Sequence, residues 1–200
     1  MPMSRLDTLI AELCPGGVEF VPLGEVIDYE QPTKYIVKNT NYDDEHKTPV
    51  LTAGQSFVLG YTKEEDGVYH ASKDNPVIIF DDFTTSFHWV DFHFKVKSSA
   101  MKLLTNKNEN LTLFKYVYYA MRCIGFEPDK ADHKRHWIGV YSGFQIPVPP
   151  LPIQHEIARI LDYFTELTAA LTTELSVRQK QYDYYRGKLL TFENANGRKV

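Results

Sequence analysis

The chain of 200 residues has few cysteines, no long apolar run and little net charge. Its two cysteines, Cys14 and Cys123, lie far apart in the sequence. This usage predicts two free, buried thiols in a reducing cytoplasm rather than a disulfide framework. No apolar run approaches the roughly 20 residues that a membrane span needs, and the first residues lack the profile of a signal peptide. We therefore expect a cytoplasmic protein with one domain of average size plus an appendage.

A strongly basic composition is also missing, since the net charge is −4. The charge is unevenly distributed along the chain. Residues 1–66 carry 5 basic and 12 acidic side chains, residues 67–150 carry 10 and 8, and residues 151–200 carry 7 and 6. A surface that faces nucleic acid would therefore be local and built mostly from the middle third of the chain.

Several catalytic patterns are absent as well. The chain has no glycine-rich phosphate loop with a lysine and no nucleophile elbow. The segment 74–77 has only a faint likeness to the active-site loop of amino-methyltransferases, because it lacks the second proline and the aromatic residue. Asp81-Asp82 is more typical of a turn that ends a strand than of a metal-binding pair. We predict no catalytic residue, no metal site and no cofactor bound by this chain.

What is present indicates an α+β fold. Hydrophobic residues make up 43% of the chain and aromatic residues 14%, which is enough for a core. Residues 4–13 have the pattern of a short, capped amphipathic helix, and residues 110–123 have helical spacing. The apolar run 76–80 predicts a buried strand, and the alternation over 87–97 predicts a half-buried one. We expect a β-rich globular domain with short helices over residues 1–150.

The segment 151–200 is expected to form a separate helix. Prolines cluster in residues 146–152, and from Ile153 to Arg186 there is neither proline nor glycine. This predicts a helix over about residues 153–190, on the order of 55 Å long at about 1.5 Å per residue. Such a helix is longer than a domain of this size, so its distal half would need a partner. The sequence leaves open the alternative that the helix folds back along its own domain.

A heptad seam with one stutter runs along this helix and predicts a coiled coil. Its members are spaced three or four residues apart: Ile157, Ile160, Phe164, Leu167, Leu171, Leu175, Arg178, Tyr182, Tyr185 and Leu189.

Three polar turns of the β-rich domain are candidates for DNA contact. Arginine and lysine bind guanine edges or phosphates, glutamine binds adenine, and serine and threonine serve either. The candidate residues are Gln55, Ser56, Thr84, Thr85, Ser86, His88, His133, Lys134, Arg135, His136 and Trp137.

Three segments resemble the specificity (S) subunits of Type I restriction–modification systems. Residues 4–26 are similar to the start of a target recognition domain, and residues 78–87 to the strand–turn–strand of one subset of these domains. Residues 146–157 resemble the junction into the family's spacer helix, the most specific of the three.

This resemblance implies a non-catalytic subunit that binds double-stranded DNA and reads one half of a split target. The helix would set the distance to the other half and dock modification subunits, which methylate adenine with S-adenosylmethionine. A restriction and translocation subunit would join for cleavage, so ATP and Mg²⁺ also belong to partners.

Family members normally hold two recognition domains and two spacer helices, whereas this sequence holds one of each. We therefore expect a homodimer that reads a palindromic split target, although pairing with a different half stays open. The alternative function is a scaffold, or a silent or anti-restriction half-subunit, that binds modification subunits without specific DNA recognition.

Overall fold

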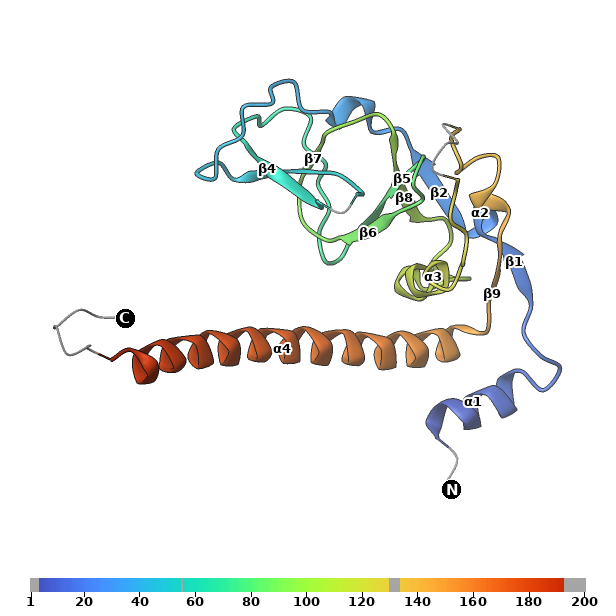
Figure 1. Cartoon of the computed structure of the whole chain (residues 1–200). Helices are drawn as coiled ribbons and strands as arrows, with labels where there is room; N and C mark the ends of the chain where they lie inside the picture. The colour runs from blue at the N-terminus through green and yellow to red at the C-terminus, as the bar shows by residue number, and fades with distance from the viewer. Residues whose placement is uncertain (1–3, 55, 130–133, 193–200) are drawn as a thin grey trace. The chain divides into compact units, whose positions relative to one another are not determined.

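The computed structural model describes residues 4–54, 56–129 and 134–192, and the chain divides into two compact units, residues 1–157 and 158–200 (Figure 1). The described strands all lie in the first unit, and the second contains most of one long helix. The predicted α+β fold with a long C-terminal helix is therefore confirmed. In chain order the elements are α1 (Arg5–Leu13), β1 (Phe20–Pro22), α2 (Leu23–Val26), β2 (Ile27–Glu30), the 3-10 helix η1 (Pro32–Tyr35), β3 (Thr48–Leu51), β4 (Val58–Thr62), β5 (Val77–Asp81), β6 (Phe87–Val90), β7 (Lys95–Val96), β8 (Met101–Asn106), α3 (Phe114–Met121), the 3-10 helix η2 (Tyr141–Gly143), β9 (Gln145–Pro147) and α4 (Leu151–Leu190).

An antiparallel sheet in the order β2-β8-β5-β6 separates two apolar cores. Successive side chains of a strand point to opposite faces. Ile78 and Phe80 of β5 therefore join one core with residues of α3, while Val77 and Ile79 join the other. All four side chains are fully buried, which confirms the buried strand predicted for residues 76–80.

The half-buried strand predicted over residues 87–97 is wrong. β6 ends at Val90, and the chain then leaves the sheet, so that β7 pairs in parallel with β3 in a second sheet of order β4-β3-β7. Lys95 and Val96 are both buried, whereas Phe92 is exposed. The alternating letters thus span two strands, and the burial of Lys95 depends on a distant acidic partner that a local pattern does not reveal.

The N-terminal helix α1 begins where the sequence predicts. The Ser4 hydroxyl accepts a hydrogen bond from the Asp7 N–H at 3.2 Å, and the Asp7 carboxylate accepts one from the Ser4 N–H at 3.0 Å. This capping box satisfies N–H groups that the first turn leaves open. The hydrogen bonds from Ser4 hold the pKa of the Asp7 carboxyl below its usual value.

The helix predicted from residue 110 is shorter in the structure, since α3 begins at Phe114. A turn precedes it, in which the Thr112 hydroxyl donates to Asn106 Oδ1 at 2.7 Å and Asn106 Nδ2 donates to the Thr112 carbonyl at 2.7 Å.

The predicted burial of both cysteines is also wrong. Cys123 follows the end of α3 and is exposed, and Cys14 is half-buried.

The beginning and the end of the first unit lie together, because β1 pairs with β9 in an antiparallel register that sets Val21 opposite Ile146. The fully buried amide of Gln154 then holds the start of α4. It accepts a hydrogen bond from the Leu113 N–H at 2.8 Å and donates to the Pro149 and Leu111 carbonyls at 2.7 and 3.0 Å. From Leu151 the helix runs without interruption to Leu190, as predicted. None of the described helices is long and apolar enough to cross a membrane.

Candidate nucleic-acid interface

The turn between β5 and β6 presents two of the predicted contact residues. Asp81 Oδ1 accepts hydrogen bonds from the Phe83 and Thr84 N–H groups at 2.9 and 2.8 Å, so Asp81 ends the strand and shapes the turn, as predicted for the Asp81-Asp82 pair. The hydroxyls of Thr84 and Ser86 lie 2.8 Å apart; Thr84 is exposed and Ser86 is partly so.

Thr85, by contrast, is buried and has a positive φ of 58°. Its hydroxyl is engaged with the Thr84 carbonyl at 2.7 Å. The Thr85 side chain is therefore turned into the protein while its two neighbours stay accessible, and this burial argues against the predicted contact of Thr85 with DNA.

Asp82 is the centre of the site, although its side chain is only 1% exposed. Its Oδ2 lies 3.0 Å from the Nζ of buried Lys102 on β8, as an ion pair rather than as an aligned hydrogen bond. Its Oδ1 accepts a hydrogen bond from the Trp137 N–H at 2.8 Å, and its carbonyl accepts one from the His136 N–H at 2.8 Å. These bonds join the hairpin to the basic segment 134–137.

The basic segment divides into an exposed and a buried half. Lys134 and Arg135 are exposed, and Arg135 Nη1 lies 4.0 Å from Asp82 Oδ2. His136 and Trp137 are buried, and the Trp137 ring packs against Phe80, with 5.2 Å between the ring centroids. The burial of both side chains argues against the predicted contact of His136 and Trp137 with DNA. They anchor the backbone that carries Lys134 and Arg135.

The turn at residues 54–57 reaches the same hairpin through β6. His88 Nε2 lies 3.2 Å from the Gly54 carbonyl oxygen, and the His88 ring lies 4.8 Å from the ring of Phe57. Ser56 is exposed and His88 is half-buried. Gln55 and His133 lie outside the described residues. The described parts of two predicted turns thus contact the hairpin whose own turn is the third.

The sequence prediction missed Asp82 and Lys102 as parts of this site. The signal for Lys102 is a lysine inside the buried apolar strand Met101–Asn106, where an unpaired ammonium group would be costly. A buried lysine predicts a buried carboxylate nearby, but one sequence does not say which of the acidic residues supplies it.

No group of three or more histidine, cysteine, aspartate or glutamate side chains in the described ranges is arranged to hold a metal ion.

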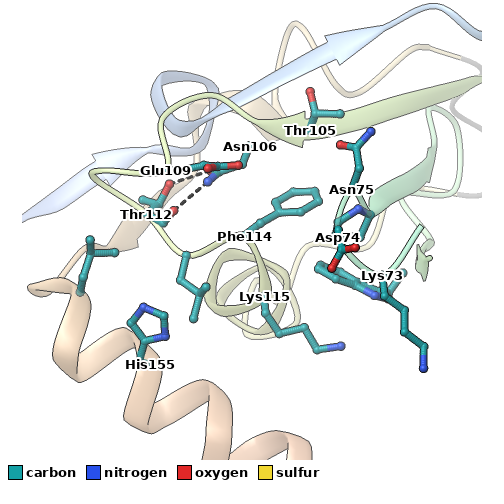
Figure 2. Close-up of a pocket in the computed structure, with 14 residues that line it drawn as sticks. Lys73, Asp74, Asn75, Thr105, Asn106, Glu109, Thr112, Phe114, Lys115 and His155 are labelled. Atoms are coloured by element: carbon teal, nitrogen blue, oxygen red, sulfur yellow. Dashed lines mark hydrogen bonds between the residues drawn. The ribbon is translucent and has the colours of Figure 1, made fainter. Parts of the chain in front are cut away.

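A pocket of about 430 Å³ opens at the other end of β5, between residues 73–76, the end of β8 and the start of α4. Figure 2 shows its Asn106 and Thr112 bonded to each other, and Lys115 Nζ lies 4.3 Å from the centre of the Trp89 ring. The polar groups of Asn106 and Thr112 are thus used within the fold.

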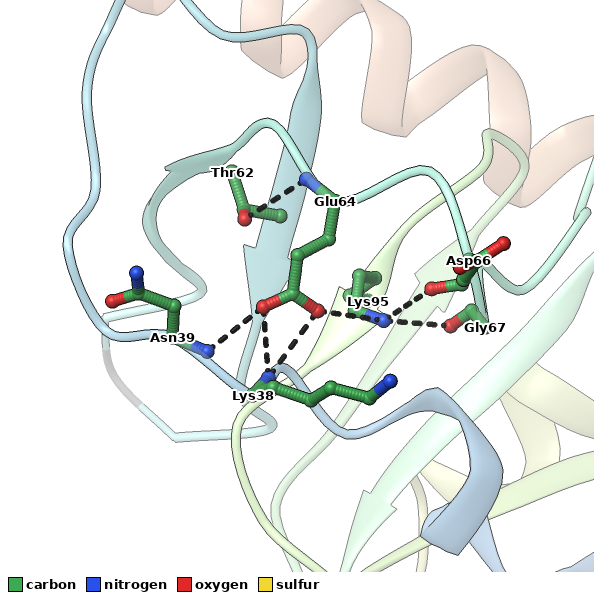
Figure 3. A network of polar contacts seen from close by, with 7 residues as sticks. All are labelled: Lys38, Asn39, Thr62, Glu64, Asp66, Gly67 and Lys95. Atoms are coloured by element: carbon green, nitrogen blue, oxygen red, sulfur yellow. Dashed lines mark hydrogen bonds and ion pairs between the residues drawn. The ribbon is translucent and has the colours of Figure 1, made fainter.

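A second buried lysine stabilises the sheet that contains β7. Lys95 Nζ lies 3.1 Å from the Glu64 carboxylate and donates to the Asp66 and Gly67 carbonyls (Figure 3). Burial disfavours the charge on Glu64, but hydrogen bonds from the Asn39 N–H, the Lys95 ammonium group and the Lys38 N–H outweigh it. The pKa of the Glu64 carboxyl therefore lies below its ordinary value.

The variant Glu64→Gln should lower the free energy of unfolding by about 2–3 kcal/mol near neutral pH, because it leaves Lys95 without its counter-ion. The depressed pKa adds a pH dependence. The contribution of Glu64 is complete above the ordinary pKa of a glutamate and is lost as the pH falls through the lower folded value. Urea unfolding should therefore show the difference between wild type and variant shrinking below about pH 4. The exposed neighbour Glu65→Gln is the control, and an equal loss in both variants would contradict the assignment.

The predicted pairing seam lies on α4. Its apolar members from Phe164 onward are exposed in the single chain, with Leu175 reaching 69%. Arg178 is bonded within its own helix, to Glu174 at 2.7 Å and Gln181 at 3.1 Å. Ile157 and Ile160 are half-buried. The pairing itself stays a prediction.

Comparison with known proteins places the chain in a family. The family model described as the Type I restriction modification DNA specificity domain matches residues 15–178. The chain belongs to this family. The Escherichia coli specificity subunit of the Type I restriction enzyme EcoR124I/EcoR124II is 57% identical over 198 residues, which cover 96% of this chain and 49% of that subunit. A putative type I restriction enzyme specificity subunit of Haemophilus influenzae is 32% identical over 97% of this chain and 52% of its own length.

A solved structure agrees with the fold of this Type I specificity chain. The S subunit of a Type I restriction–modification system from M. genitalium superposes with a TM-score of 0.62 at 16% identity, over 87% of this chain and 46% of that one. The chain spans about half the length of the curated relatives that it matches.

Proposed function

We propose that this chain is a DNA-binding part of a Type I specificity subunit and reads one half of a split target. The observation that carries the proposal is that two polar segments distant in sequence, residues 54–57 and 134–137, contact the β5–β6 hairpin, whose own turn is the third. This arrangement puts the cations of Lys134 and Arg135 on the same scaffold as the hydroxyls of Ser56 and Thr84. Cations that contact phosphates set the register of a protein on DNA, and hydroxyls accept or donate at base edges.

The partners proposed for the chain follow from its family. Modification subunits would methylate adenine with S-adenosylmethionine, and a restriction and translocation subunit would use ATP and Mg²⁺ for cleavage. In this proposal the chain contributes no catalytic group and binds no cofactor. It directs the chemistry of the other subunits to a DNA sequence.

We also propose that α4 pairs with a second copy of the chain through its seam. The exposed apolar side chains from Phe164 to Leu189 support this role, because an apolar stripe of this length is typical of a helix that is covered by another. Two identical seams that pair antiparallel produce a two-fold assembly. Identical domains would then read identical half-sites.

The double variant Lys134→Ala/Arg135→Ala tests the DNA contact. It should weaken binding to a duplex and lower the slope of log K against log salt by up to about 2, since each lost phosphate contact removes about 0.9 from the slope. Fluorescence anisotropy at several KCl concentrations measures both effects.

The matched control is Lys73→Ala/Lys107→Ala. These two lysines are also exposed, but they flank β5 and β8 at the ends opposite the hairpin turn. They should leave the slope unchanged. An unaltered slope in Lys134→Ala/Arg135→Ala would mean that the basic segment is an ordinary solvated surface.

A further inference from the structure

We infer that buried Lys102 controls DNA affinity without touching DNA, because it neutralises Asp82 and so leaves the Arg135 guanidinium group available to a phosphate. Lys102 is in this sense a positioning residue for Arg135. The inference rests on the proposed function and adds to it a residue that lies inside the core.

The geometry places one carboxylate between two cations. Asp82 Oδ2 lies 3.0 Å from Lys102 Nζ and 4.0 Å from Arg135 Nη1. Lys102 and Asp82 are both about 1% exposed at the side chain, whereas the Arg135 side chain is 50% exposed. The near pair is therefore shielded from solvent, and the distant partner is the one that an external anion can reach.

The charges of the three groups leave one positive charge in excess. The charge on Lys102 is confined, since its ammonium group is enclosed between Asp82 and the face of the Tyr29 ring at 5.6 Å. The excess consequently resides on Arg135. A half-exposed ion pair at 4.0 Å is weak, whereas a guanidinium group binds a phosphate through two charge-assisted hydrogen bonds. Arg135 can therefore exchange Asp82 for a phosphate at little cost.

The backbone of the basic segment does not depend on the Arg135 side chain. The Trp137 and His136 N–H groups both donate to Asp82, and the Trp137 ring is packed against Phe80. These contacts hold the segment, so the side chain of Arg135 is left for the ligand. Without Lys102, Arg135 is the cation that the described residues place within 4.0 Å of the buried Asp82 carboxylate. Arg135 would then be withdrawn from the surface.

The test compares salt slopes for the full-length chain bound to a mixed-sequence 40-base-pair duplex. Lys102→Met should lower the slope by about 1, as Arg135→Ala does. Adding Arg135→Ala to Lys102→Met should produce no further loss. Asp82→Asn/Lys102→Met removes both buried charges and should restore the wild-type slope. On that background Arg135→Ala should again lower it by about 1.

A wild-type slope in folded Lys102→Met would overturn the inference. So would an Asp82→Asn/Lys102→Met variant that is folded but keeps the reduced slope, because a purely structural role for Lys102 predicts no rescue. A wild-type chain that does not bind the duplex overturns the proposed function and the inference with it. Binding that responds to Arg135→Ala but not to Lys102→Met overturns the inference alone.

A second measurement uses the wild-type chain and avoids any variant that fails to fold. The Arg135 Nε–Hε cross-peak in ¹⁵N spectra should shift as the duplex is titrated, since its partner changes from a carboxylate to a phosphate. A cross-peak that stays in place while the duplex binds would contradict the inference.

Discussion

Replacing Asp82 by asparagine should lower the free energy of unfolding by about 3–5 kcal/mol, as expected when one partner of a buried ion pair is removed. The variant leaves Lys102 buried with an ammonium charge and removes the carboxylate that lies 3.0 Å from its Nζ. The amide oxygen of asparagine still accepts the Trp137 N–H, so the loss comes from the uncompensated charge and not from the hydrogen bond. Urea unfolding followed by circular dichroism measures the change.

Two variants separate this explanation from a general effect on the hairpin. Asp81→Asn should cost much less, because Asp81 is not fully buried and its bonds to the Phe83 and Thr84 N–H groups persist with an amide oxygen. Asp82→Asn/Lys102→Met should regain most of the stability lost in Asp82→Asn, since a buried ion pair is often replaced by apolar groups at little cost. Equal losses in Asp81→Asn and Asp82→Asn would mean that Lys102 is not held by Asp82.

The double variant Leu171→Asp/Leu175→Asp should abolish self-association of the chain. Both leucines are exposed members of the seam, and two carboxylates on each helix would have to be buried unpaired in the paired state. Light scattering at micromolar concentration should give the wild type twice its chain mass of 23.1 kDa and the variant a single mass. The melting of residues 1–157 should not change, because the two substitutions lie in the other unit.

The control for this prediction is Thr173→Asp/Ser176→Asp, which adds the same charges on the opposite side of the helix. It should remain paired. A wild-type chain that is monomeric at micromolar concentration would contradict pairing with a second copy and leave the DNA contact untouched. If pairing holds, methylated bases in a host that expresses the chain with the modification subunit proposed for it should lie in a palindromic split target.

Local sequence patterns were sufficient to predict the helices and strands whose structure depends mainly on their own residues. α1 follows from the Ser4 cap and an apolar stripe, and α4 follows from the proline cluster and the absence of helix breakers after it. β5 was predicted from a short continuous apolar run, which is typical of a strand buried on both faces. In each case the hydrogen bonds or the periodicity act within a few residues, so a local pattern contains the information.

The composition of the candidate interface could be predicted only in part. Ser56, Thr84, Lys134 and Arg135 were recognised by residue type and proved exposed. Trp137 and its neighbour His136 are also residue types that can contact DNA, but both side chains are buried. Residue type states what a side chain can bind, whereas burial states whether a ligand can reach it, and burial depends on chain segments far away.

The sequence by itself determined the α+β class, the long helix with its seam, and the family resemblance that the comparisons confirm. Only the tertiary structure decided that β6 ends at Val90, that two lysines are buried, and that two distant segments contact the β5–β6 hairpin. The reason is the range of the interactions. Helix periodicity and capping act over three or four residues, whereas the partner of Lys102 is 20 residues away in the chain and that of Lys95 is 31.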